Sequence, residues 1–294
     1  MSGNSLHGVL PVDKPSGVTS HDVVAAARRA LGERRIGHTG TLDPFASGLL
    51  LLCVGEATRL AEYLTAEEKR YDATVRLGAA TDSGDLDGDV LSTCEKWRDV
   101  TPEILEAALS ELRGAREQLP PSLSAKKVAG IPAHRRVRRG EQVVLSARPV
   151  VVHELEATTF ELPEVRLKIR CSSGTYVRAL ARDLGERLGV GAHLTALRRT
   201  AIGRFAVDRA IGMERLGDAQ SVAEALLSPL RALGHLPRLE VGAEASEDLG
   251  HGRSVAVPGE SDTSVAVTAC GNRLVAVGAV EEGRFRPRKV LAHG

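Results

Sequence analysis

The sequence predicts a mixed α/β protein whose last part is a small β-rich segment. Capped stretches with apolar residues at helical spacing alternate with strand-like stretches over most of the chain. Beyond two prolines, Pro229 and Pro237, short apolar strands separated by glycine, aspartate and asparagine turns take over. A length of 294 residues fits one large domain or two of unequal size, and 43% hydrophobic residues can form a substantial core.

The chain begins with a predicted strand, a turn and a capped helix. Residues 8–13 form a short apolar strand, and Lys14–Gly17 form a turn. Thr19 or Ser20 can cap the following helix, because each offers a hydroxyl to the unpaired backbone N–H groups of its first turn. Gly32 then ends the helix, since glycine readily adopts the left-handed conformation found at helix ends.

The next part of the chain alternates between turns, strands and a helix. Residues 36–48 are rich in turn formers, and the apolar run 49–54 follows directly. This run suits a buried strand or a short core helix, which periodicity does not distinguish. Residues 69–77 alternate as a strand does. Residues 102–113 form a helix that starts on a proline and is followed by a glycine.

A second strand and helix, followed by C-terminal strands, complete the predicted elements. Residues 165–171 alternate strictly, so that Arg166, Lys168 and Arg170 give the strand one basic face. After a Ser-Ser-Gly turn, a helix runs from about residue 176 to 188. The strands expected in the C-terminal segment are 264–269, 274–280 and 289–291.

Charge composition gives an ambiguous indication of the binding partner. The net charge is +1, from 39 basic and 38 acidic residues, so composition alone does not indicate a nucleic-acid partner. The charge is unevenly distributed, however, because residues 126–139 contain Lys and Arg but neither Asp nor Glu. This stretch is either a solvated surface or a basic loop that contacts phosphates, and we favour the loop.

Cysteine spacing and hydropathy indicate the cellular compartment. The 4 cysteines form no C-x-x-C pair, which argues against a zinc site and against a disulfide framework. The histidines show no metal-ligand spacing. No apolar run reaches the length of a membrane span, and the N-terminus lacks a signal-peptide pattern. We therefore expect a soluble, reduced, cytoplasmic protein that binds no metal and no membrane.

Asp43 is the first candidate catalytic residue. It follows a glycine-rich loop and directly precedes Pro44, and a proline disfavours helical conformation in the residue before it. We therefore expect its carboxylate on a loop where glycines permit close approach of a ligand. An isolated Leu-Asp-Pro more often forms a turn or a helix cap, so the motif alone leaves both interpretations open.

Arg178 lies where a strand turns into the predicted helix 176–188. The helix dipole disfavours a cation in the first turn of a helix. A carboxylate partner would compensate, and a two-pronged arginine–carboxylate pair would also orient that carboxylate. The alternative is an arginine on a solvated surface.

Tyr71 and His38 are two further candidates with open interpretations. Tyr71, on the alternating strand 69–77, can pack in a core or offer its ring to an unstacked base. His38, in Gly-His-Thr-Gly, can bind a phosphate or pack beneath its turn.

Eight ordered blocks carry a resemblance to a known family. They are GVLPVDKPSGVTS at 8–20, GHTGTLDPFASG at 37–48, GEAT at 55–58, KRY at 69–71, GAATDSGDLD at 78–87, SSGTYVR at 172–178, GAH at 191–193 and LRR at 197–199. Together they resemble the TruB family of tRNA pseudouridine synthases. Any one block alone would be weak evidence, whereas eight in this order are specific.

The resemblance implies a domain organisation. Residues 1–232 would form a pseudouridine-synthase catalytic domain of mixed α/β type, built on a largely antiparallel sheet, with an RNA-clamping basic loop at about 124–148. Residues 236–294 would form a PUA-like RNA-binding domain, an assignment that rests on position and strand content. The basic loop lacks a tyrosine that family members often carry there, which leaves its contacts with RNA unassigned.

The resemblance also implies an activity and the roles of individual residues. The family isomerises uridine 55 in the T-loop of tRNA to pseudouridine with neither cofactor nor metal, and a monomer is expected. Asp43 would be the catalytic aspartate, Arg178 its partner and Tyr71 the ring that stacks on the target base. The substrate-binding residues would be His38, Tyr71, Tyr176, Leu197, Lys14 and Lys126.

The chemistry of this reaction agrees with these residue types. The N1–C1′ bond must break and a C5–C1′ bond must form. A carboxylate can attack C1′ as a nucleophile or act as a base on the sugar, and the sequence does not choose between these routes. The base must leave its stack, which favours a pocket with an aromatic platform that excludes water. A proton must then leave C5, with Tyr71 or a water as a candidate to assist.

Three other interpretations stay open at this point. A guide-dependent synthase, the catalytic subunit of a ribonucleoprotein, shares these motifs, although short termini without lysine-rich tails favour a stand-alone enzyme. An RNA-binding or tRNA-folding protein could have lost catalysis, but the presence of Asp43, Tyr71 and Arg178 argues against loss. An unrelated enzyme in which Asp43 only caps a turn is disfavoured by the eight-block match.

Overall fold

The computed structural model describes residues 6–121, 127–128, 131–132, 146–258, 263–269 and 273–291. The chain forms two compact units. The first comprises Met1–Leu42, Leu49–Thr65 and Arg204–Gly294, and the second comprises Asp43–Gly48 and Ala66–Gly203. The predicted domain boundary between residues 232 and 236 stays a prediction.

The first unit contains a short sheet with helices packed on it. Its strands are β1 (Gly8–Lys14), β2 (Ile36–His38), β3 (Ser47–Val54) and β14 (Ile211–Gly212), in the order β14–β1–β3, with β2 antiparallel to β3. The helical segments are α1 (Ser20–Leu31), η1 (Gly55–Leu60), α2 (Ala61–Thr65), η3 (Val207–Arg209), η4 (Met213–Arg215), α6 (Ala219–Ala225) and α7 (Pro229–Ala232), and a short strand, β13, covers Phe205–Ala206. The run 49–54, left open between strand and helix, is a strand buried along its whole length.

Local signals set the ends of α1. Thr19 caps the helix, because its hydroxyl accepts from the Asp22 N–H (3.1 Å) and the Asp22 carboxylate accepts from the Thr19 N–H (2.9 Å). Gly32 ends it with a left-handed φ of 63°. Ser20, the other predicted cap, instead exchanges hydrogen bonds between its hydroxyl and the main chain of Leu42. The amphipathic helix places Val23, among others, in a core with β1 and β3.

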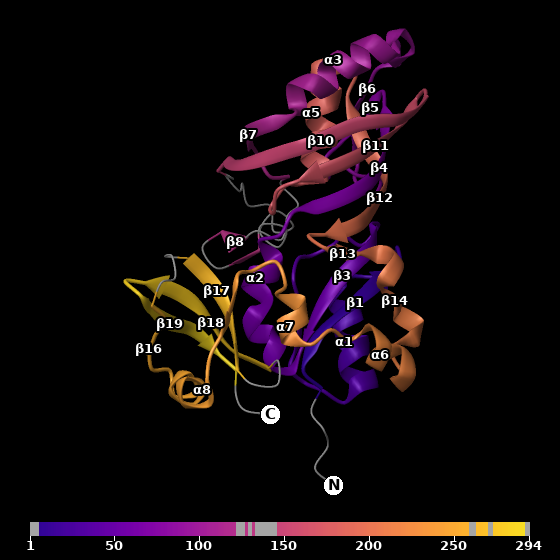
Figure 1. The fold of residues 1–294 in the computed structure, drawn as a ribbon. Helices are drawn as coiled ribbons and strands as arrows, with labels where there is room; N and C mark the ends of the chain where they lie inside the picture. The colour runs from indigo at the N-terminus through magenta and orange to yellow at the C-terminus, as the bar shows by residue number, and fades with distance from the viewer. Residues whose placement is uncertain are drawn as a thin grey trace. The chain divides into compact units, whose positions relative to one another are not determined.

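The C-terminal part of the first unit contains a second sheet, seen in yellow and orange in Figure 1. Its strands are β15 (Arg238–Glu240), β17 (Thr263–Ala269), β18 (Arg273–Glu281), β19 (Arg284–Val290) and β16 (Val255–Ala256), in this order. Helix α8 (Ala243–Gly250) contributes Leu249 to a core that includes Val265, Val275 and Phe285. The predicted β-rich segment is therefore confirmed.

The second unit is built on a largely antiparallel sheet, as expected for the fold class. The strands run in the order β12 (Ala192–Ile202), β4 (Lys69–Leu77), β11 (Glu164–Cys171), β10 (Arg148–Glu161) and β7 (Gly114–Gln118), each antiparallel to its neighbour. The other elements are β5 (Ala79–Thr81), β6 (Val90–Thr93), η2 (Glu95–Asp99), β8 (Lys127–Val128) and β9 (Ile131–Pro132).

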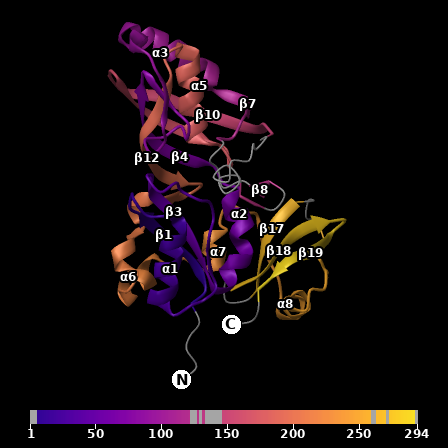
Figure 2. The same ribbon diagram turned by 180° about the vertical axis from the view of Figure 1, so that it is seen from behind.

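Two helices cover one face of this sheet. Helices α3 (Pro102–Leu112) and α5 (Val177–Leu188) lie side by side against it in both views (Figures 1 and 2). Both begin close to their predicted positions. Thr101 and Pro102 start α3, and Gly189 ends α5 with a left-handed φ of 67°. No helix in the described part of the chain is long and apolar enough to cross a membrane.

Candidate active site

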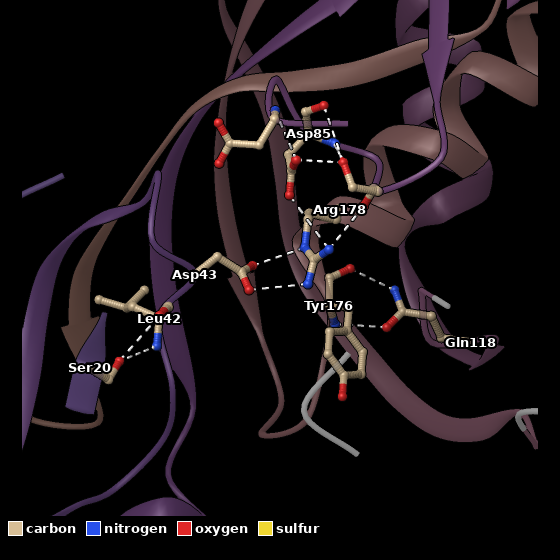
Figure 3. A network of polar contacts seen from close by, with 9 residues as sticks. Ser20, Leu42, Asp43, Asp85, Gln118, Tyr176 and Arg178 are labelled. Carbon is tan, nitrogen blue, oxygen red and sulfur yellow. Dashed lines mark hydrogen bonds and ion pairs between the residues drawn. The ribbon is translucent and has the colours of Figure 1, made fainter. Parts of the chain in front are cut away.

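Asp43 and Arg178 meet in a two-pronged ion pair (Figure 3). The Arg178 Nε donates to one Asp43 carboxylate oxygen at 2.9 Å, and Nη2 donates to the other at 3.1 Å. The two residues are far apart in sequence but belong to the same compact unit. A planar guanidinium that engages both oxygens fixes the plane of the carboxylate as well as its position.

The two partners differ in their exposure to solvent. The Arg178 side chain is 6% exposed, whereas the Asp43 side chain is 31% exposed. The cation is therefore shielded behind the carboxylate, and the carboxylate is the part of the pair that a substrate can reach. This arrangement suits a reacting carboxylate held from behind.

The loop that carries Asp43 forms a turn and also directs the Asp43 carboxylate to Arg178. The Asp43 carbonyl accepts a hydrogen bond from the Ala46 N–H at 3.1 Å, so the main chain does form a turn. Leu42, the preceding residue, is fixed through its main chain by Ser20 (Figure 3). The turn and the catalytic interpretations of Asp43 are therefore compatible, because the backbone makes the turn while the carboxylate engages Arg178.

A second carboxylate, Asp85, lies on the other side of Arg178 (Figure 3). Its Oδ2 is 3.5 Å from the Arg178 Nη1, which also donates to the Ser83 carbonyl at 2.9 Å. The Asp85 Oδ1 accepts from the Ser83 hydroxyl at 2.5 Å and from the Asp87 N–H at 3.1 Å. Asp85 is 7% exposed at the side chain, so it is a buried anion that contacts a buried cation.

Sequence reasoning missed Asp85. Asp82, Asp85 and Asp87 all lie in the block at 78–87, but nothing in that block distinguishes one aspartate from the others. The distinguishing feature is three-dimensional. Gly84 has a φ of 76°, and a Cβ there would lie 3.2 Å from the Arg178 carbonyl, so the loop packs directly on the start of α5.

Tyr71 lies on the same unit and is almost fully buried. It pairs across strands with Arg199, while Ala73 pairs with Leu197, so Tyr71, Leu197 and Arg199 share one face of the sheet. Burial raises the pKa of Tyr71 above its usual value; Arg199, which hydrogen bonds with the hydroxyl, opposes this effect, and Cys171 and Asp43 reinforce it. The Tyr71 hydroxyl therefore stays protonated at neutral pH, and the Asp43 carboxylate lies within electrostatic range of it.

Lys69 is a buried lysine on β4 with an unusual titration. Burial and the neighbouring Arg199 lower the pKa of Lys69 to about 8. Its ammonium donates to the Glu67 carbonyl at 2.5 Å. Sequence reasoning noted Lys69 only as part of the KRY block.

Tyr176 occupies the N-cap position of α5, two residues before Arg178. Its side chain is partly exposed, and the guanidinium of Arg148 stacks over its ring at 4.5 Å from the centroid. Tyr176 and Arg178 are therefore positioned by the same helix start.

His38 and Lys14 lie in the first unit, at the ends of β2 and β1. The Nδ1 of His38 accepts from the Gly40 N–H at 3.3 Å, and its ring contacts that of His21 edge to face, with the ring centroids 5.6 Å apart.

Lys14 is fully buried, and its ammonium donates to the carbonyls of Pro15 at 3.0 Å and Val18 at 2.7 Å. These contacts indicate a loop-stabilising role for Lys14. The last predicted site residue, Lys126, lies outside the described residues.

Within the described ranges, no group of three or more His, Cys, Asp or Glu is arranged to hold a metal ion. The arrangement of Asp43, Arg178, Asp85 and Tyr71 offers a fixed, solvent-reachable carboxylate within electrostatic range of a protonated phenol. Such a site can perform nucleophilic or general-base chemistry.

Comparisons with known proteins identify the family. Residues 28–177 match the model described as TruB family pseudouridylate synthase (N terminal domain), and residues 178–233 match the tRNA pseudouridylate synthase B C-terminal domain. A tRNA pseudouridine synthase B of Azoarcus sp. (strain BH72) is 43% identical over 289 residues, which is 98% of this chain and 95% of the relative. One of Mycolicibacterium paratuberculosis (strain ATCC BAA-968 / K-10) is 43% identical over 97% of both chains.

Solved structures show the same fold. A chain of a Cbf5-Nop10-Gar1 complex superimposes with a TM-score of 0.76 at 28% identity, covering 97% of this chain and 84% of that chain. A chain of an H/ACA RNP bound to a substrate RNA containing 2′-deoxyuridine gives 0.74 at 26% identity, with coverage of 97% and 84%.

The mixed α/β fold and the two family matches define the class of the protein as a pseudouridylate synthase. On the extent of these matches, the chain belongs to the TruB family of pseudouridylate synthases.

Proposed function

We propose that this protein converts uridine 55 in the T-loop of tRNA to pseudouridine without a guide RNA, with Asp43 as the nucleophile. The observation that carries the proposal is the two-pronged Asp43–Arg178 pair. It presents a carboxylate of fixed orientation at a position that solvent can reach. Relatives that cover almost the whole chain are named tRNA pseudouridine synthase B, which supports tRNA as the substrate.

In the proposed reaction, a carboxylate oxygen of Asp43 attacks C1′ of the target uridine. The N1–C1′ bond breaks, and its electron pair leaves with the uracil ring. The ring turns, C5 attacks C1′, and the Asp43–C1′ bond breaks, which regenerates the carboxylate. The proton on C5 then leaves, and N1 gains one, so the overall reaction is an isomerisation.

Arg178 and Asp85 serve this chemistry by orientation. Arg178 binds both carboxylate oxygens of Asp43 and so fixes the side-chain rotamer of Asp43 before it attacks C1′. Asp85 and the Ser83 carbonyl hold the far side of the guanidinium, which prevents Arg178 from swinging away when Asp43 reacts.

Tyr71 is assigned here as a platform for the flipped base rather than as the base that removes the C5 proton. A tyrosine accepts a proton only as its phenolate, and burial raises the pKa of Tyr71. Water or the regenerated Asp43 carboxylate is therefore the better acceptor. A ring held on a sheet beside Leu197 can stack on an unstacked pyrimidine.

The alternative is a guide-dependent RNA pseudouridine synthase subunit. It is favoured by one observation, the fold match to chains of the Cbf5 and H/ACA complexes at 26–28% identity. The 43% identity to proteins named tRNA pseudouridine synthase B supports the stand-alone function more strongly. A third reading, RNA binding or tRNA folding without catalysis, is disfavoured by an intact Asp43–Arg178 pair.

The test is release of tritium from an unmodified tRNA transcript that carries [5-³H]uridine. We expect release by the wild type with no other component, and none by Asp43→Asn. Replacing uridine 55 of the transcript by cytidine should abolish release. Tight binding of bare tRNA without tritium release would refute the stand-alone function. Tritium release that persists after uridine 55 is replaced by cytidine would refute uridine 55 as the target.

We propose further that residues 236–294 form a PUA-like RNA-binding domain and that the protein acts as a cytoplasmic monomer. The second sheet supports the domain, because β19 carries the exposed residues Arg284, Arg286 and Arg288 along one strand. Filter binding of tRNA by a triple Arg→Gln variant tests this assignment, and unchanged affinity at several salt concentrations would remove it. Light scattering tests the monomer.

A further inference from the structure

Gln118, the last residue of β7, makes a two-pronged contact with the main chain of Tyr176 (Figure 3). Its Oε1 accepts from the Tyr176 N–H at 2.8 Å, and its Nε2 donates to the Tyr176 carbonyl at 3.0 Å. The side chain is 0% exposed. A buried amide that satisfies both main-chain groups of one residue clamps that residue's backbone.

The clamped residue is the start of α5, where ordinary capping is missing. Tyr176 is the N-cap, and no side-chain cap bond from it is formed within the described residues. The first turn of α5 contains no acidic residue and does contain Arg178, which the helix dipole disfavours. The helix start therefore needs an external hold, and Gln118 supplies one.

We propose that Gln118 is a positioning residue for the reaction. By fixing the main chain of Tyr176, it fixes the helix start that carries Arg178, and Arg178 in turn orients Asp43. This inference rests on the proposed catalytic role of Asp43. Gln118, at the end of β7, thus affects the orientation of the Asp43 carboxylate without contacting it.

Neighbouring contacts complete the clamp. Gln118 pairs in register with Arg148 on β10, and the Arg148 guanidinium stacks on the Tyr176 ring and donates to the Gly174 carbonyl. The residue after Gln118, Leu119, accepts from Arg182 on α5 through its carbonyl at 3.2 Å. Gln118 holds the Tyr176 backbone, whereas Arg148 contacts its ring. Substitution of Gln118 therefore tests the hold on the backbone separately from the contact with the ring.

The substitution Gln118→Glu tests the proposal through pH. A carboxyl at this position still accepts from the Tyr176 N–H, but it can donate to the Tyr176 carbonyl only when protonated. Burial and the facing carbonyl oxygen favour the protonated form, whereas the guanidinium of Arg148 on the paired strand favours the charged form. Because Gln118 is 0% exposed, we expect burial to dominate, so that the protonated form persists to higher pH than in an exposed glutamate. The rate of single-turnover tritium release by Gln118→Glu should equal the wild-type rate near pH 6. At pH 8.5 it should be about 10-fold or more below the wild-type rate at the same pH.

Two further variants separate positioning from folding. Gln118→Met removes both hydrogen bonds at every pH, so its turnover should be low and its ratio to wild type independent of pH. Gln220→Glu, on an exposed residue of α6, controls for the general effect of adding a carboxylate. The affinity for tRNA should change less than threefold in all three variants, and rates should be compared only at temperatures where circular dichroism shows each variant folded.

The outcomes are distinct from those of the function test. If wild type shows turnover that depends on Asp43, but Gln118→Glu follows the wild-type pH profile and folded Gln118→Met keeps the wild-type rate, the positioning role is overturned. A loss of thermal stability in Gln118→Met without loss of turnover by the folded protein would show a purely structural residue and overturn it as well. Absence of wild-type turnover would instead refute the function itself.

Discussion

Replacing Asp85 by asparagine removes one charge from the ion pairs around Arg178 with little change in shape. The asparagine oxygen can still accept from the Ser83 hydroxyl and the Asp87 N–H, which hold Asp85 in the structure. The attraction to Arg178 is lost, however. Arg178 would then be held on its far side by the Ser83 carbonyl without a second anion.

The size of the effect follows from the distance and the burial. Two unit charges 3.5 Å apart attract by about 5 kcal/mol at an effective dielectric constant of about 20. Desolvation of a buried carboxylate offsets a large part of this, which leaves about 1–3 kcal/mol to hold Arg178 in place. If that free energy is lost from the transition state, turnover falls about 5- to 150-fold.

The assay is single-turnover tritium release with enzyme in excess, accompanied by filter binding of tRNA. Asp87→Asn is the matched control, because Asp87 lies in the same loop and is exposed. We expect Asp85→Asn to lose rate while keeping affinity, and Asp87→Asn to keep both. A rate for Asp85→Asn within twofold of the wild type would show that Arg178 needs no second carboxylate.

Two further predictions concern buried lysines. Because the pKa of Lys69 is lowered to about 8 from 10.5, the unfolded chain binds more protons than the folded one between these pH values, and the free energy of unfolding should rise with pH in this window by up to about 3 kcal/mol. Urea unfolding at pH 7–10 should show this rise in the wild type and not in Lys69→Met; parallel curves would contradict it. Lys14→Met leaves the carbonyls of Pro15 and Val18 without the buried ammonium, so the unfolding free energy should fall by about 2 kcal/mol while tRNA affinity per folded molecule is kept. A folded variant with weakened tRNA binding would instead support the predicted role of Lys14 in substrate binding.

Elements with local signals could be predicted from the sequence. The ends of α1 are set by Thr19 and Gly32, and the start of α3 by Thr101 and Pro102, and in each case the residue acts on its own turn. The strand β4 was likewise recognised from alternation, because one of its faces is buried and the other is not.

Elements that depend on distant partners could not be predicted in this way. The strand β10 is long, yet its side chains mix exposed and buried positions irregularly, and its pairing with β11 contains register shifts. Such bulges break the period of two on which strand prediction rests. The roles of Asp85 and Gln118 are hidden for a related reason, since each depends on a partner at the start of α5 that is distant in sequence.

The position of Arg178 could be recognised as unusual from the local sequence, but its partners could not be identified. It shows how a local sequence can indicate a remote contact. A cation in the first turn of a helix contradicts local preference, and a contradiction that persists in a folded protein requires compensation elsewhere. The compensation is threefold: Asp43 and Asp85 neutralise the charge, and Gln118 secures the helix start that lacks its own cap. A helix start whose residues oppose their position is therefore evidence for buried partners, although only the fold reveals which residues they are.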